Sequence, residues 1–68
     1  MTVGSRVKQT LADLKGIENT LNVYSLKSSS KEESRVFKEA FETVEKVSKN
    51  IEKRLKKIEL EEPQYKQK

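Results

Sequence analysis

Apolar residues recur along two stretches of the chain, with spacings that alternate between three and four. The first stretch consists of Val3, Val7, Thr10, Leu14, Ile17, Leu21 and Tyr24. The second consists of Phe37, Phe41, Val44, Ser48, Ile51, Leu55 and Ile58. This spacing is typical of the seam of a coiled coil. The sequence therefore predicts two long helices, each with one apolar stripe.

The two stripes match each other when the chain folds back on itself. The antiparallel pairs are Val3 with Ile58, Val7 with Leu55, Ile17 with Val44, Leu21 with Phe41, and Tyr24 with Phe37. All of these pairs centre near residues 30 and 31, beside a turn-like run of three serines at 28–30. We therefore predict an all-α fold: a two-helix antiparallel hairpin with a coiled-coil-like seam.

Local signals indicate where each helix begins and ends. Thr2 can cap the first helix, and Ser30 with Glu33 has the spacing of a capping box at the start of the second. Pro63 disfavours helical geometry at the residue before it and so ends the second helix. The expected organisation is a hairpin over residues 1–62, with helices at about 3–26 and 31–62 and a turn at 27–30, followed by a C-terminal tail at 63–68.

The chain is too small for its two helices to enclose a core alone. It has 68 residues, of which 38% are charged and 32% hydrophobic. A lone hairpin buries only one side of each helix, and further apolar residues widen the stripes, namely Leu11, Val36, Ala40 and Val47. We therefore expect a homodimer or higher homo-oligomer, most simply two hairpins that form a four-helix bundle.

The composition argues against most chemistry. Cysteine and histidine are absent, which removes disulfides, thiol catalysis and the commonest metal ligand. No nucleophile–base pair and no glycine-rich phosphate loop is present. We expect no enzyme activity, no catalytic residue, no cofactor and no metal. The chain has no apolar run of membrane-spanning length and no signal-sequence pattern, so we expect it to be cytoplasmic.

Five lysines cluster on one side of the second predicted helix, opposite its stripe. This lysine face consists of Lys46, Lys49, Lys53, Lys56 and Lys57. One interpretation is a solvated face, supported by glutamates four residues before Lys46, Lys49 and Lys56. The other is an electrostatic footprint for anionic lipid, nucleic acid or an acidic protein. The net charge of +4 is moderate and no aromatic residues are interleaved, which disfavours base readout of nucleic acid.

Two polar features of the predicted helices have alternative interpretations. Thr10 and Ser48 lie within the stripes, where each hydroxyl either bonds the carbonyl one turn earlier or fixes the register of the helices. Glu59, with Glu61 and Glu62, forms an acidic cluster at a helix C-terminus, where negative charge is unfavourable. We expect this cluster to contact a basic group, with Arg6 and Lys8 as candidates.

Several residues are not explained by the helical pattern and are therefore candidates for contact with a partner. Gly4 and Gly16 weaken the first helix, and Gly16 is either a tolerated exposed glycine or a point of close backbone approach. Tyr65 follows Pro63 and can anchor the tail to a partner. The full set of interaction candidates is Gly4, Leu11, Gly16, Val47, Pro63 and Tyr65.

Both ends of the chain resemble a known family. The start, Met1-Thr2-Val3-Gly4 followed by Val7-Lys8-Gln9-Thr10-Leu11-Ala12 and Leu14-Lys15-Gly16, resembles the opening of a family of short proteins from spore-forming Firmicutes. The end, Glu61-Glu62-Pro63-Gln64-Tyr65-Lys66, resembles the close of the same family. The family is described only as a domain of unknown function, and the lysine-rich middle of this chain departs from its pattern.

The resemblance implies a context rather than a mechanism. Genes of this family lie near those of the stage-five sporulation A membrane proteins, which move dipicolinic acid during spore formation. It implies a role in sporulation, with a spore membrane protein as a partner and a location in the spore core or at the spore inner membrane. No site residue is carried over, because the family has no established activity.

Overall fold

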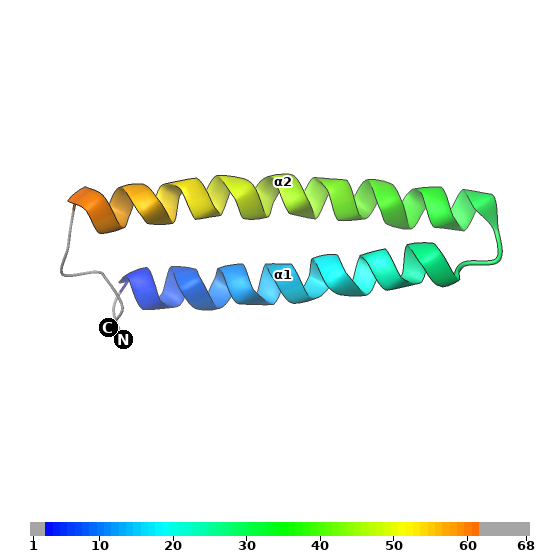
Figure 1. The fold of residues 1–68 in the computed structure, drawn as a ribbon, viewed down its shortest axis with the longest axis horizontal. Coiled ribbons are helices and arrows are strands. Elements are labelled where there is room, and N and C mark those ends of the chain that lie inside the picture. Colours follow the sequence, from blue (N-terminus) through cyan, green and yellow to red (C-terminus); the bar gives the residue numbers. More distant parts are fainter. Residues whose placement is uncertain (1–2, 62–68) are drawn as a thin grey trace.

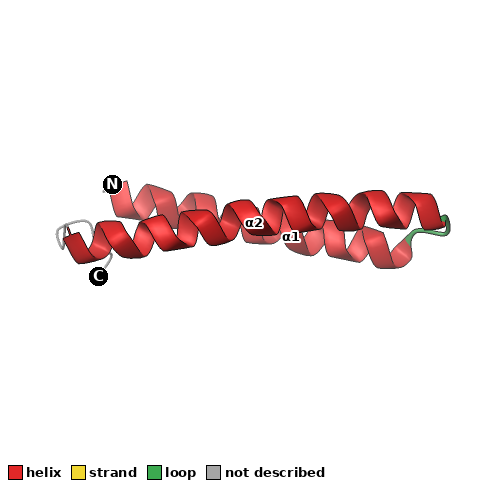
Figure 2. Ribbon diagram, turned by 90° about the horizontal axis from the view of Figure 1, so that it is seen from above, coloured by secondary structure: helices red, strands yellow, loops and turns green. Residues whose placement is uncertain are grey.

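The computed structural model describes residues 3–61, which form two helices that run side by side in opposite directions. Helix α1 spans Val3–Lys27 and helix α2 spans Lys31–Glu61, with a short turn between them (Figure 1). Seen from above, the helices cross at a shallow angle near their middle (Figure 2). This arrangement confirms the predicted all-α helical hairpin.

The hairpin is a single layer of helices. Its dimensions are 48 × 17 × 11 Å, and the smallest of these equals the diameter of one helix with its side chains, about 10–12 Å. Each helix therefore has one neighbour and exposes both broad faces of the layer.

Serine side chains shape the turn. The Ser28 backbone N–H and hydroxyl both donate to the Tyr24 carbonyl, at 3.0 and 2.7 Å, and so satisfy the end of α1. At the start of α2 the Ser30 hydroxyl accepts a hydrogen bond from the Glu33 N–H at 3.3 Å. Ser30 thus caps α2 as its spacing from Glu33 predicts, and Glu32 and Glu33 place negative charge at the positive end of the helix dipole.

The stripe predicted for α2 faces α1. Its seven members are all partly or fully buried: Phe37, Phe41, Val44, Ser48, Ile51, Leu55 and Ile58. However, Leu55, at 7% exposure, is the only large apolar residue among the described residues that is buried. The hairpin alone therefore has almost no closed hydrophobic core.

The prediction of which α1 residues face α2 is confirmed for only part of the stripe. Val7, Leu14 and Leu21 are partly buried as expected, but Val3, Ile17 and Tyr24 are 50%, 48% and 51% exposed, and Thr10 is exposed as well. The positions one residue later replace them at the contact with α2, namely Gly4, Leu11, Glu18 and Ser25. Helix α1 is thus rotated by about one heptad position, or roughly 50°, relative to the prediction.

Polar groups give the physical reason for this rotation. Ser48 lies in the α2 stripe and is fully buried, so its hydroxyl needs a partner. The Glu18 carboxylate supplies that partner, and it does so only if α1 turns Glu18 rather than Ile17 toward α2. Of the two alternatives for Ser48, the structure therefore shows the bond between helices and not a bond within its own helix. The pairing of Tyr24 with Phe37 survives the rotation, with ring centroids 5.5 Å apart.

Candidate interaction surface

The two long sides of the hairpin differ in chemistry. On one side, here called the polar side, the residues of α1 and α2 that meet are Lys8, Glu18 and Ser25 with Ser34, Ser48 and Glu59. The other side, here called the apolar side, consists of Val3, Val7, Ile17, Tyr24, Phe37, Ala40, Val47, Ile51 and Ile58. Residues seven apart share a face of a coiled helix, which is why each side runs the length of the hairpin.

A hydrogen bond between two buried polar side chains lies at the centre of the polar side. The Ser48 hydroxyl donates to Oε2 of Glu18 at 2.5 Å. Glu18 is 8% exposed and Ser48 is fully buried. Every buried side-chain nitrogen and oxygen in residues 3–61 has a hydrogen-bond partner. The pair therefore favours the observed rotation and alignment of the two helices, because separating it while both groups stay buried would leave a carboxylate without its partner.

Further contacts close the polar side at both ends. Near the turn, the Ser34 hydroxyl donates to the Ser25 carbonyl at 2.8 Å, and the Ser25 hydroxyl donates to the Ser34 carbonyl at 3.2 Å. At the far end, Lys8 Nζ lies 3.2 Å from Oε2 of Glu59. This ion pair confirms the predicted contact between the acidic end of α2 and the start of α1.

Both sides carry grooves: one on the polar side is lined by residues that include Ser25, Leu26 and Phe41. The grooves of the apolar side are the following. One groove lies between the helices and is lined by Arg6, Val7, Thr10, Ile51, Arg54 and Ile58. A second lies near the turn, where Tyr24 and Phe37 meet beside Lys27. Val47, at 45% exposure, borders a third with Ile51 and Arg54. These grooves leave apolar side chains from both helices open to water.

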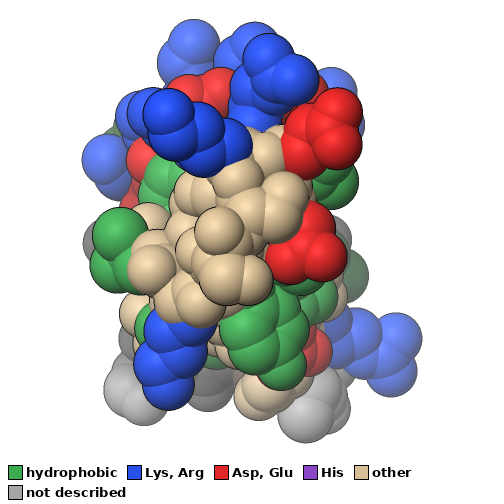
Figure 3. All heavy atoms as spheres, turned by 90° about the vertical axis from the view of Figure 1, so that its right-hand side faces the viewer, with side chains coloured by type: hydrophobic (Ala, Val, Ile, Leu, Met, Phe, Trp, Pro, Cys, Tyr) green, Lys and Arg blue, Asp and Glu red, His purple; other side chains and the backbone are tan. Residues whose placement is uncertain are grey.

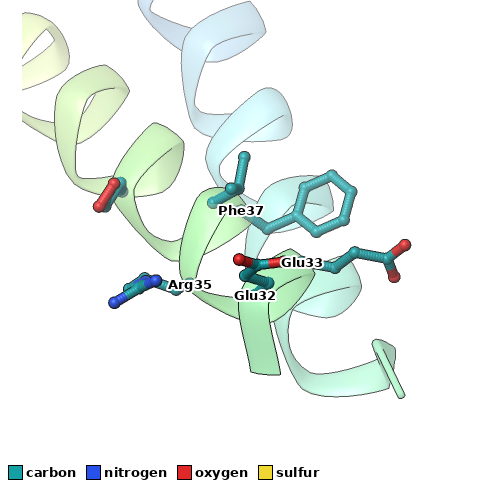
Figure 4. Close-up of a pocket in the computed structure, with 6 residues that line it drawn as sticks. Glu32, Glu33, Arg35 and Phe37 are labelled. Carbon is teal, nitrogen blue, oxygen red and sulfur yellow. The ribbon is translucent and has the colours of Figure 1, made fainter. Parts of the chain in front are cut away.

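Another hollow in the described part of the chain lies at the start of α2. Its lining residues are Glu32, Glu33, Arg35, Val36, Phe37 and Glu39. Figure 4 shows that these come from one helix, and that Glu33 and Arg35 point to opposite sides. Such a hollow has no second wall and no converging polar groups, so it lacks the form of a small-molecule site.

The five members of the lysine face are all exposed. Figure 3, a view from the turn end, shows basic side chains gathered over the outer surface of α2, away from α1. The pairs expected with glutamates four residues earlier do not form: among residues 3–61, the ion pair of Lys8 with Glu59 is the only one within 4 Å. The ammonium groups of this face therefore point into solvent.

The structure distributes the other interaction candidates over different parts of the hairpin. Gly4 is buried and Leu11 is partly buried, both where α1 meets α2, so each has a packing role within the hairpin. Gly16 is exposed, and a Cβ added there would meet no atom within 4 Å, so no contact within the hairpin requires a glycine. Val47 lies on the apolar side. Pro63 and Tyr65 lie outside the described residues.

The described residues show no features of a metal site or membrane span. No three potential metal-binding side chains in residues 3–61 are grouped so that they could hold an ion. Within the same range, neither helix combines the length and the apolar character that crossing a membrane requires.

A family model matches residues 7–55, which is most of the chain. Its description is a protein of unknown function, DUF1657. The chain belongs to the DUF1657 family. Neither the search of curated proteins nor the search of solved structures gave a match. The matched residues cover most of both helices and include the Glu18–Ser48 pair.

The first prediction concerns the buried polar pair. Ser48→Ala removes the partner of a buried carboxylate and should lower the free energy of unfolding by about 1–3 kcal/mol. Urea unfolding followed by circular dichroism, at one fixed protein concentration, measures this loss.

Thr20→Ala is the matched control, because the Thr20 hydroxyl is exposed and bonds only the Gly16 carbonyl of its own helix, at 3.1 Å. It should change stability by less than about 0.5 kcal/mol. Equal effects of the two variants would contradict the role assigned to the pair. The double variant Glu18→Leu/Ser48→Ala, which replaces both polar groups, should recover the stability lost in Ser48→Ala.

Proposed function

We propose that this DUF1657 protein is a non-enzymatic interaction protein that self-associates through its apolar side. One observation supports this most strongly: Leu55 is the only large apolar residue buried within the described hairpin, while apolar residues of both helices line one open side. Covering that side with more helices would complete a core in the manner of a four-helix bundle. A homodimer is the simplest assembly of this kind.

The proposed biological setting is sporulation. Its support is the resemblance of the two ends of the chain to short proteins of spore-forming bacteria. The proposed location is the spore core or the periphery of the spore inner membrane. In that setting a spore membrane protein is an alternative partner for the apolar side. The absence of histidine and cysteine from the sequence supports a role without catalysis.

The second prediction tests self-association. Size exclusion with light scattering over a concentration series should give twice the 7.9 kDa mass of the chain at high concentration. Ile17→Lys places a charge in the apolar side and should yield a monomer. Ile17 is 48% exposed in the hairpin itself, so the substitution spares the contacts between α1 and α2, and the loss of helical content that should accompany it reflects loss of the assembly.

Asn19→Lys is the control, because it adds the same charge at an exposed polar position of the same helix. It should remain dimeric. A wild-type protein that is monomeric at every concentration would contradict self-association, and the search for a partner would then move to spore membrane proteins.

A second candidate function uses the lysine face. We propose as an alternative that it binds phosphate-bearing surfaces, either anionic membrane or nucleic acid, with low specificity. The supporting observation is that none of its five ammonium groups has a carboxylate within 4 Å among residues 3–61. Unpaired charge of this kind gives binding that weakens steeply as salt rises.

The third prediction separates this candidate from a merely solvated face. At low ionic strength the protein should sediment with phosphatidylglycerol vesicles or shift duplex DNA in a gel, and lose that binding near 0.15 M salt. Lys49→Gln/Lys53→Gln/Lys56→Gln should abolish it. Lys15→Gln/Lys27→Gln/Lys31→Gln removes equal charge from exposed positions elsewhere and should retain it. Absence of binding at low salt, or equal loss in both triple variants, would contradict this candidate.

A further inference from the structure

The charges of α2 are divided between its two halves. Residues 31–45 carry five glutamates against three basic residues, a net charge of −2. Residues 46–60 carry six basic residues against two glutamates, a net charge of +4. Helix α2 is therefore acidic at the turn end of the hairpin and basic at the other end.

This division continues along the edge where α2 borders the apolar side. Glu33, Ala40, Val47 and Arg54 are each seven residues apart and so follow one line on the helix. The line is acidic at one end, basic at the other and apolar between. The four residues are also arranged symmetrically about a midpoint near Thr43. When two α2 helices lie antiparallel about this midpoint, Glu33 of one faces Arg54 of the other, and Ala40 faces Val47.

From this symmetry, and building on the self-association proposed above, we infer that the partner of the apolar side is a second copy in reversed orientation. The two hairpins lie face to face with their turns at opposite ends, and α2 of one copy packs antiparallel to α2 of the other. Each Glu33 then lies by Arg54 of the second copy, and the acidic half of each α2 lies along a basic half.

The opposite orientation, with both turns at the same end, is disfavoured by charge. Arg6 and Arg54 already line one groove within a single hairpin. Two copies with their turns together would bring four arginines to one end of the bundle, together with the basic halves of both α2 helices. Juxtaposed like charges of this kind oppose association.

The middle of the assembly is apolar on both helices. Ile17 and Val44 each lie two turns from the contact of Tyr24 with Phe37, toward the middle of the hairpin. The two-fold axis near Thr43 therefore passes close to Ile17 of both copies. The face available is roughly 600–800 Å² on each hairpin, given its 17 Å width and the length of α1, which is close to the ~800 Å² per partner of a standard interface.

Charge reversal tests the arrangement. Glu33→Arg and Arg54→Glu should each raise the concentration at which half the protein is dimeric by about tenfold, because each creates two like-charge contacts per dimer. The double variant Glu33→Arg/Arg54→Glu again places opposite charges next to each other, but only if the two copies are in reversed orientation. Its concentration of half-dimerisation should therefore return to near the wild-type value. Failure of the double variant to recover would overturn the pairing.

A cysteine pair tests the position of the axis, since the chain has no cysteine of its own. Thr43→Cys lies near the axis and should be joined to its own copy by a short bis-maleimide crosslinker. Val36→Cys, on the same face but two turns away, would lie about 22 Å from its copy and should not be joined. A dimer in which Val36→Cys crosslinks, or Thr43→Cys does not, would overturn the inferred arrangement and leave self-association standing. A protein that is monomeric at all concentrations would overturn both.

Discussion

The thickness of the hairpin limits how much apolar surface its two helices can bury. A layer 11 Å deep gives each helix a single neighbour, so residues beside the seam stay in contact with water. Apolar burial is the main favourable term in folding, and only Leu55 is buried among the large apolar residues described. Some of the apolar residues that remain exposed, among them Ile17, Tyr24 and Val47, lie along one side of the layer, and these form the candidate interaction surface.

Buried polar contacts decide which side becomes apolar. Glu18 with Ser48, and Ser25 with Ser34, join the helices along the polar side, where the ion pair of Lys8 with Glu59 also lies. When these polar side chains form their hydrogen bonds between the helices, half of the apolar stripe predicted for α1 is rotated away from α2. Buried polar contacts of this kind contribute more to alignment than to stability, because an apolar replacement of similar volume is often as stable. In this hairpin they select one rotation of α1 and leave Ile17 and Tyr24 available to a partner.

The fold was predictable because its signals are local and periodic. The three-and-four spacing predicts both helices, the capping pair of Ser30 and Glu33 predicts the start of α2, and the α2 stripe faces α1 as expected. The rotation of α1 was not predictable from apolar spacing, because that spacing gives Ile17 and Tyr24 more weight than Glu18 and Ser25. The fully buried Ser48 shows why: the partner of a polar core residue lies on another helix, thirty residues away along the chain. The candidate surface required the structure for the same reason, since all four of its α1 members were expected in the seam.

The central claim is that the hairpin is stable as an assembly whose apolar side is covered by a further copy. The most direct test is the midpoint of thermal unfolding, followed by circular dichroism, over protein concentrations from about 1 to 100 μM. The account predicts a midpoint that rises steadily with concentration, because mass action favours the assembled state over unfolded chains. A single cooperative transition with a midpoint independent of concentration would show that one hairpin is stable alone, and would contradict the account.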